Sequence, residues 1–344
     1  MNHRLFKIIF GLSTALLVLS LLGLFFWKPL GPLQPAAEKP LVLQEEEIVP
    51  YDLLSDVKDE YSLNIQSQLP ESEMHIPAQA LCVMVEKYVD AMKCHFQCPG
   101  EHEGELRLIS EALLLDEVFE THRYGLTSNK QLQVVTPLYT LAFQCVVRKS
   151  SGIRSLNELA GKRVAVGPAG SETERLTRRL FEAHGLAASS FIPVFIDMSE
   201  AAEAMEAGNV DCIAVHSSVP SPFIARLASN FDITLLPLDQ VRFIDRIGEI
   251  LPGYEIVTIP SQTYKGMDGY ILTAATKVML AAERDTKMVI TYEVTKALYD
   301  HMTEFKSIFP ADREIKGDQL NDRSAVSFHQ GATKYFWERD LIWK

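Results

Sequence analysis

The chain has 344 residues, of which 47% are hydrophobic and 23% are charged, and its formal net charge is -12 at pH 7. This length and composition fit one or two ordinary globular domains. The excess of negative charge argues against a nucleic-acid-binding protein, because Lys and Arg side chains must neutralise the phosphates.

The N-terminus carries an uncharged, apolar segment at residues 8–27, preceded by Arg4 and Lys7. A helix of that length spans about 30 Å, the hydrocarbon thickness of a bilayer. We therefore expect a transmembrane helix that acts as a signal anchor, with residues 1–7 as a cytoplasmic tail, because positive charge stays on the cytoplasmic side. A cleaved signal peptide is the alternative. Both interpretations place the rest of the chain outside the cytoplasm.

Residues 28–58 follow this segment and are rich in proline, with three consecutive acids at residues 45–47. Such a composition favours an extended, solvated chain over packed structure. We interpret the segment as a stiff spacer that holds a folded domain away from the membrane.

The five cysteines are too few to specify a disulfide scaffold. Cys94 and Cys98 flank His95, which suggests a metal site, but the spacing matches no strong zinc pattern. In a strand these two cysteines would lie about 13 Å apart, too far for a disulfide between them. We therefore predict neither a metal nor a cofactor, and we interpret Cys145 and Cys212 as buried thiols.

Strand and helix patterns alternate from about residue 60. We expect a short strand at residues 61–65, a helix that opens at Pro77, and strands at residues 132–135 and 138–147. A start at Pro77 is favoured because proline in the first helical turn leaves no backbone hydrogen bond unmade.

The clearest pattern covers residues 151–255. Two capping boxes, at residues 155–158 and 171–174, each predict the start of a helix, because a serine hydroxyl can accept a bond from a first-turn amide. Further strands are expected at residues 163–166, 191–196, 210–215 and 233–236, and further helices at 199–207, 222–230 and after Asp239. This alternation favours a mostly parallel sheet covered by helices on both faces.

The remainder of the chain predicts how the domain is organised. A strand at residues 271–281 and a helix at residues 286–304 are too little for a separate core, so they should pack back against the first part. The predicted fold class is α/β with two lobes and a cleft between them. Residues 59–150 and 256–344 form the first lobe, and residues 151–255 are inserted as the second.

The stretch VAVGPAGSETERL at residues 164–176 carries the strongest functional signal. A phosphate loop would need a lysine after Gly170, and a dinucleotide fingerprint would need one more glycine. A nucleophilic Ser171 would need the G-x-S-x-G pattern, although partners distant in sequence stay open. The remaining interpretation is an anchor for an anionic or carbonyl group at a helix start. The simpler alternative is that Ser171 only caps its helix.

Four segments resemble one known family: SGIRSLNELAGKRVAVGPAGSETERL at 151–176, GYEIVTIPSQTYKGMD at 253–268, ITYEVTKALYDHM at 290–302 and HQGATKYFWERDL at 329–341. They are similar to TAXI-type extracytoplasmic solute-binding subunits of TRAP transporters, over about residues 60–344. The resemblance implies a type II-like, two-lobe clamp on the periplasmic side of the inner membrane, anchored by residues 8–27 or released after cleavage. It implies no catalysis. The clamp would hand a small organic solute, a carboxylate or an amino acid, to integral membrane permease subunits.

The chain departs from this family where ligand contacts are expected. A glycine-rich strand end is replaced by residues 66–68, and a glycine after Ser171 is replaced by Glu172. The charge of Glu172 would repel a carboxylate ligand by ~1 kcal/mol or more at close range. The candidates for the cleft lining stand at strand ends, turns and helix starts: Ser67, His75, Pro168, Gly170, Ser171, Thr173, Ser217 and Pro220.

Two functions therefore compete. The first is a solute receptor for a TRAP-type importer. The second is a membrane-anchored interaction or sensor protein that keeps the clamp but has an altered cleft. Arg107, Arg148 and Arg242 could pair with a carboxylate, although solvated charge is the commoner fate of arginine. No nucleophile, metal-ligand set or acid pair favours an enzyme.

Overall fold

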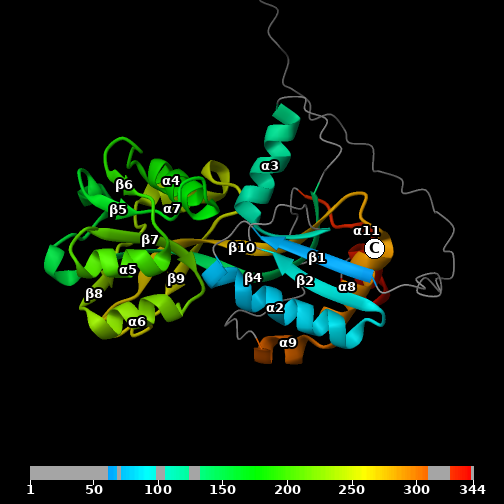
Figure 1. The fold of residues 1–344 in the computed structure, drawn as a ribbon. Helices are drawn as coiled ribbons and strands as arrows, with labels where there is room; N and C mark the ends of the chain where they lie inside the picture. The colour runs from blue at the N-terminus through cyan, green and yellow to red at the C-terminus, as the bar shows by residue number, and fades with distance from the viewer. Residues whose placement is uncertain (1–60, 68–70, 98–104, 124–131, 309–325, 342–344) are drawn as a thin grey trace, which may run out of the picture. The chain divides into compact units, whose positions relative to one another are not determined.

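The computed structural model describes residues 61–67, 71–97, 105–123, 132–308 and 326–341 (Figure 1). The predicted tail, membrane helix and spacer at residues 1–58 lie outside these ranges. Within them, no helix combines the length and the apolar character needed to cross a membrane.

Within the described residues, ten strands form one sheet in the order β2-β1-β3-β10-β4-β7-β5-β6, with β8 paired to β4 and β9 paired to β10. Their bounds are β1 (Tyr61–Ser67), β2 (Met92–Gln97), β3 (Leu106–Ser110), β4 (Leu132–Arg148), β5 (Arg163–Ala165), β6 (Ile192–Val194), β7 (Cys212–Ser217), β8 (Ile233–Leu235), β9 (Glu255–Ile259) and β10 (Ile271–Glu283). The helices are α2 (Glu71–Tyr88), α3 (Glu111–Arg123), α4 (Glu172–His184), α5 (Met198–Glu206), α6 (Pro222–Asn230), α7 (Val241–Ile250), α8 (Met288–Asp300), α9 (Met302–Ile308) and α11 (Gln330–Glu338).

The sheet is mixed, whereas the sequence pattern predicted a mostly parallel one. β1 pairs in parallel with β2 and β3, and β5 pairs in parallel with β6 and β7. The prediction fails in the middle of the sheet, where β4 and β10 run antiparallel to each other and to their neighbours β7 and β3. β4 has 17 residues, enough to pair with β10 at one end and with β7 and β8 at the other.

We call β1–β3 with α2, α8, α9 and α11 the first section, and β5–β8 with α4–α7 the second section. Figure 1 shows β4 and β10 passing from one section into the other. The division into two lobes, with boundaries at residues 150 and 255, stays a prediction.

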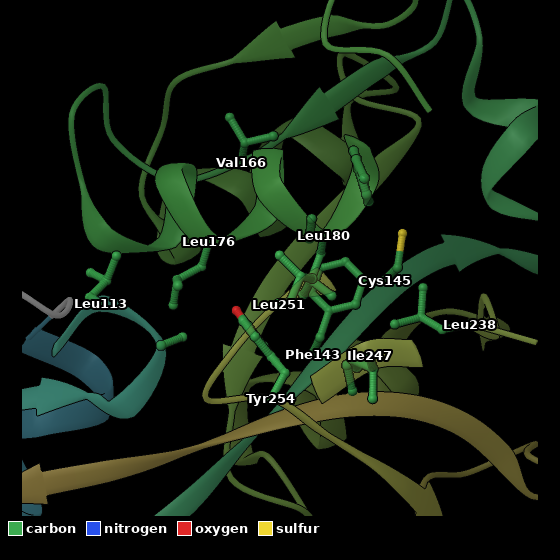
Figure 2. Close-up of a cluster of buried hydrophobic side chains, with 14 of the residues drawn as sticks. Leu113, Phe143, Cys145, Val166, Leu176, Leu180, Leu238, Ile247, Leu251 and Tyr254 are labelled. Carbon is green, nitrogen blue, oxygen red and sulfur yellow. The ribbon is translucent and has the colours of Figure 1, made fainter. Parts of the chain in front are cut away.

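A shared cluster of buried apolar side chains joins the two sections (Figure 2). Leu113 of α3 belongs to the same cluster as Leu176 and Leu180 of α4, together with Phe143 and Tyr254. All five are at most 5% exposed. Because burial of apolar surface is itself stabilising, this cluster holds α3 against α4.

Of the two predicted capping boxes, the serine at residues 171–174 caps its helix, and the serine at residues 155–158 makes no capping bond. Ser171 caps α4, with its Oγ accepting a hydrogen bond from the amide of Glu174 at 3.2 Å. At the other box the hydroxyl of Ser155 donates to Glu158, at 3.1 Å, and only a short 3₁₀ helix follows at Leu156–Leu159.

The largest differences from the predicted elements concern α2, β4 and α8. Helix α2 begins at Glu71, so Pro77 lies inside the helix, where it is buried. Proline removes one backbone hydrogen bond from the helix. Most helical stability in a protein comes from packing of the buried face, so the helix extends through Pro77 despite this loss. The two strands predicted at 132–147 form the single strand β4, and the helix predicted at 286–304 is interrupted at His301.

Cys82 and Cys94 form a disulfide that joins α2 to β2, with a Cα–Cα distance of 5.0 Å. Sequence analysis did not predict this pair, because the two positions meet only when the helix packs on the strand. Cys94 therefore offers no thiolate for a metal. Cys145 and Cys212 are buried free thiols, which confirms the interpretation made from their apolar surroundings.

Candidate functional site

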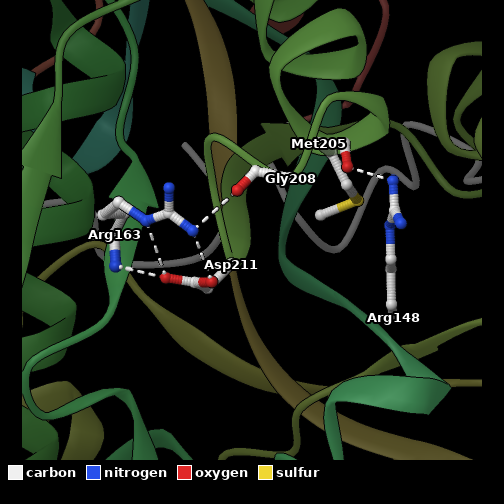
Figure 3. A network of polar contacts seen from close by, with 5 residues as sticks. All are labelled: Arg148, Arg163, Met205, Gly208 and Asp211. Carbon is white, nitrogen blue, oxygen red and sulfur yellow. Dashed lines mark hydrogen bonds and ion pairs between the residues drawn. The ribbon is translucent and has the colours of Figure 1, made fainter.

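The amino-terminal edge of β5 and β7 is closed by the protein's own groups (Figure 3). Arg163 pairs with Asp211 at 2.9 Å between Nη2 and Oδ1, and also donates to the carbonyl of Gly208 at 2.7 Å. The hydrogen bond from Arg163 lowers the pKa of Asp211 below its usual value. Ligands of α/β sheets bind beyond the carboxyl ends of the strands, so the opposite edge is the place for a site.

A cavity of about 340 Å³ lies at that carboxyl edge, where α4 and α5 begin. It is lined by Ala165, Gly167, Pro168, Thr173, Ile196, Asp197, Met198, Ser199, Ala201, Ile213, Ala214, Val215 and His216. Most of these side chains are apolar, with a few polar groups among them, which is the usual composition of a small-molecule site.

The start of α4 forms one wall of the cavity through Thr173. Gly167 has a φ of 91°, and a Cβ added there would lie 3.0 Å from both Ser171 Oγ and Thr173 Cβ. Glycine is therefore needed for the turn to pack this closely on the helix start. The amide of Gly170 donates to the side chain of Glu174 at 2.7 Å, which fixes the same turn from the helix side.

The start of α5 forms a second wall, and sequence analysis missed it. Asp197 caps α5 by accepting the amide of Glu200 at 2.8 Å and the hydroxyl of Ser199 at 2.7 Å. The first of these bonds is the largest cause of the lowered pKa of Asp197, so its carboxylate is ionised at neutral pH. An Asp three residues before a Glu, directly after an apolar strand, is the signal that could have identified this cap.

His216 of β7 completes the cavity wall, and it too was missed. Its ring is buried, with Nε2 3.1 Å from the hydroxyl oxygen of Tyr254 and with Nδ1 lacking a hydrogen-bond partner. Burial lowers the pKa of His216 to about 3, so the imidazole is neutral at physiological pH. The ring therefore adds no charge to the cavity wall.

The charge of the cavity wall limits what can bind. Asp197 is ionised and His216 is neutral, and the residues that line the cavity include neither Lys nor Arg. A ligand carboxylate would therefore depend on the amides and partial positive charge at the starts of α4 and α5. A ligand ammonium group, by contrast, would find a carboxylate in the wall.

Two of the eight predicted site residues, Pro168 and Thr173, line this cavity. Gly170 and Ser171 shape the turn and the helix cap beside it. Ser67 is buried at the carboxyl end of β1, in the first section. His75 lies in α2, where its side chain is not described.

Ser217 and Pro220 belong to a neighbouring polar network. The amide of Gln144 donates to Ser217 Oγ at 2.7 Å, and Gln144 Oε1 accepts from the hydroxyl of Tyr264 at 2.6 Å. Tyr264 in turn accepts the amide of Ser221, directly after the cis bond between Val219 and Pro220. Neither Ser217 nor Pro220 lines the cavity.

Two of the arginines considered for a ligand carboxylate are engaged by the protein. Arg107 pairs with Glu117 at 3.2 Å. Arg148 donates to the carbonyl oxygens of Met205 and Glu206, as Figure 3 shows for Met205. Both guanidinium groups therefore have structural roles in this conformation.

Glu172 is not among the residues that line the cavity, contrary to the expectation that its side chain stands where a ligand would bind. Its side chain is 2% exposed, and Oε1 accepts the amide of Ser110, where α3 begins, at 3.2 Å. Burial raises the pKa of Glu172 to about 7, against the hydrogen bonds from Ser110 and the attraction of Arg175. Removal from water therefore outweighs the favourable field of the helix start.

Comparison with known proteins gives a family match and remote structural similarities. The NMT1-like family matches residues 105–339, which include every residue of the cavity wall. An ancestral arginine-binding protein bound to arginine is 14% identical with a TM-score of 0.44, over 72% of this chain and 96% of that one. The periplasmic aliphatic sulphonate binding protein SsuA from Escherichia coli is 15% identical with a TM-score of 0.39, over 72% and 77%. A TctC solute binding protein from Polaromonas is 14% identical with a TM-score of 0.41, over 82% and 95%.

Proposed function

We propose that this chain, which belongs to the NMT1-like family, is a non-catalytic binding protein for a small organic solute. The observation that carries the proposal is the cavity at the carboxyl edge of β5 and β7, bordered by two helix starts and lined mainly by apolar side chains. This is where α/β sheets place their ligands. The resemblance of residues 151–176 to TAXI-type subunits points the same way.

The wall of the cavity favours an amino acid over a simple carboxylate. Asp197 would pair with an ammonium group, and the amides at the start of α4 would take the carboxylate. The apolar side chains of Ile196, Met198 and Ile213 would contact the rest of the molecule. A dicarboxylate would lack a cationic side chain among the lining residues.

We further propose that the protein works on the periplasmic side of the inner membrane. Residues 8–27 would anchor it there, or would be removed to release it, and integral membrane TRAP permease subunits would receive the solute. These proposals rest on the sequence of the N-terminus and on the TAXI resemblance.

Ligand-induced thermal stabilisation of the full-length chain in detergent tests the proposed function. The probes are neutral amino acids, the matching carboxylic acids without the amine, and the matching amines without the carboxylate, each at millimolar concentration. A ligand that binds only the folded state raises the melting temperature. We expect stabilisation by at least one amino acid and little by its two fragments. No shift with any of the three classes would contradict the proposal.

Two threonines in α4 provide a matched pair of variants. Thr173→Val removes a hydroxyl from the cavity wall, and we expect about tenfold weaker binding, as for the loss of one hydrogen bond. Thr177→Val makes the same change one turn later, where the hydroxyl is buried without a partner and does not line the cavity. Its affinity should stay that of the wild type. Equal affinity for both variants would mean that the ligand binds at another site.

The second candidate is an anchored interaction or sensor protein that needs no solute. The observation in its favour is that Glu172, together with the shared apolar cluster, fills the contact between α3 and α4. Capture of a membrane partner that is unaffected by the amino acid probes would favour this function. Loss or gain of the partner on adding a stabilising probe would favour a solute receptor.

A further inference from the structure

The contact between α3 and α4 contains one buried acid that the proposed solute site does not use. Glu172 extends from the first turn of α4, in the second section, to the residue where β3 ends and α3 begins. One carboxyl oxygen accepts the amide of Ser110, and the other is buried without a partner. The side chain therefore connects the two sections through its hydrogen bonding to Ser110, in a buried environment.

The backbone amides at the start of α3 are satisfied by the protein's own side chains. The amide of Ser110 donates to Glu172, that of Ala112 donates to Thr276 at 3.2 Å, and that of Leu113 donates to the hydroxyl of Ser110 at 3.4 Å. A helix start attracts anions through such amides. Glu172 thus occupies the position that an anion would take at the start of α3.

The charge state of Glu172 should determine how well this contact holds. An ionised carboxylate with an unpartnered oxygen in a dry interface is far less favourable than a neutral carboxyl in the same place. A proton on Oε2 removes the charge and leaves Oε1 able to accept the amide of Ser110.

The charged and titratable groups around Glu172 do not offer a strong counter-ion. Arg175 attracts it from α4, but the side chain of Arg175 is exposed, and Glu117 of α3 repels it. Its charge also acts on Tyr254, in the turn before β9. Other charged side chains on these elements are paired with each other: Arg107 of β3 with Glu117 of α3, Arg179 of α4 with Asp116 of α3, and Lys277 of β10 with Glu111 of α3.

We propose that Glu172 is a protonation-dependent latch, which closes the start of α3 against α4 when its carboxyl holds a proton and releases it when the carboxyl ionises. The latch would keep the two sections together in the absence of solute. Its consequence for solute uptake rests on the proposed function, because release would ease the opening that a clamp needs. The latch itself requires no ligand.

Hydrogen exchange of the full-length protein without added solute tests the latch. The measured quantity is the protection of the amides at residues 108–115, corrected for the intrinsic effect of pH, between about pH 5.5 and pH 8.5, a range that spans the titration of a buried carboxyl. We expect wild-type protection to fall about tenfold or more as pH rises, as for a contact worth ~1.4 kcal/mol. Protection of residues 223–229 in α6, a segment without an acidic or histidine side chain, should stay constant.

Two glutamate variants on the same helix separate the latch from general charge effects. Glu172→Gln keeps the shape and cannot ionise, so its protection at residues 108–115 should not change with pH. Glu182→Gln removes an exposed charge from the same helix and should behave as the wild type. Wild-type protection that does not change with pH, or the same slope in E172Q and E182Q, would overturn the proposal.

The outcome is independent of the solute experiments. If E172Q does not fold, the wild-type comparison of residues 108–115 with residues 223–229 still decides, because it needs no variant. A pH-dependent latch in a protein that no amino acid stabilises would leave the latch in place and remove the solute receptor. Stabilisation by an amino acid without any pH dependence of protection at residues 108–115 would support the solute receptor and overturn the latch.

Discussion

The starts of α3 and α4 are both helix N-termini beside the carboxyl ends of strands, yet their surroundings differ. At the start of α4, Thr173 lines about 340 Å³ of space that α5 borders on the other side. At the start of α3, Glu172, Thr276 and the hydroxyl of Ser110 accept the backbone amides. The same local geometry thus borders a cavity in one place and forms a closed contact in the other.

Adjacent residues of α4 produce this difference. Thr173 and Glu172 are consecutive, so their side chains leave the helix about 100° apart, one toward the cavity and one toward α3. Helix starts offer amides and partial positive charge wherever they occur. Whether a helix start can bind a ligand depends on whether the protein's own side chains already accept its amides.

The strongest test of the closed contact is the replacement Gly253→Ala. Gly253 has a φ of 83°, and a Cβ there would lie 2.7 Å from the backbone N and Cα of Ala112 in the first turn of α3. Backbone strain and overpacking together should lower the free energy of unfolding by about 4 kcal/mol. Denaturant unfolding followed by circular dichroism measures the change.

Gly248 provides the control for this replacement. It lies in α7, and a Cβ there would meet no atom within 4 Å. Gly248→Ala should leave stability unchanged or raise it by up to about 1 kcal/mol, because alanine is the better helix former. If both variants have the stability of the wild type, then α3 is not packed closely against the turn that contains Gly253.

The next test concerns the pH dependence of stability. The pKa of Glu172 is raised from 4.5 to about 7 in the folded protein, so the group stabilises the fold below pH 4.5 and loses that contribution as pH rises through 7. The shift corresponds to about 3 kcal/mol. The difference in unfolding free energy between E172Q and the wild type should therefore grow in favour of E172Q from pH 5 to pH 8.

This difference is measured by urea unfolding at matched pH values, with E182Q as the reference variant. Because Glu182 is exposed, E182Q should follow the wild type at every pH. A constant offset between E172Q and the wild type would mean that Glu172 titrates normally. The interface at the start of α3 would then be open to water, and the contrast with the start of α4 would disappear.

The sequence predicted one of these helix starts and not the other, for a physical reason. Ser171 and Glu174 form a local capping pattern that is visible without any tertiary information, and the structure confirms it. The closure of α3 depends on Ser110, Glu172 and Gly253, which are far apart in the chain. No local pattern specifies where such residues meet.

The lack of tertiary information in local patterns also explains why one residue of the cavity wall could not be predicted. Asp197 follows the local capping pattern of α5 and could have been identified. His216 could not, because its role depends on burial beside Phe143 and Tyr254 from other strands and turns. The antiparallel strands β4 and β10 were also invisible in the alternation of local elements, since strand direction is a tertiary property.

The smallest expected effect comes from the cap of α4. Ser171 Oγ accepts the amide of Glu174, so Ser171→Ala should lower the unfolding free energy by about 1 kcal/mol. Ser221 holds the equivalent position before α6 but makes no capping bond, and its buried hydroxyl lacks a partner. Ser221→Ala should therefore be nearly neutral by the same urea measurement. If only S171A lowers the unfolding free energy, the capping bond of Ser171 stabilises the start of α4. If both variants lower it equally, Ser171 contributes no more than a serine that makes no capping bond.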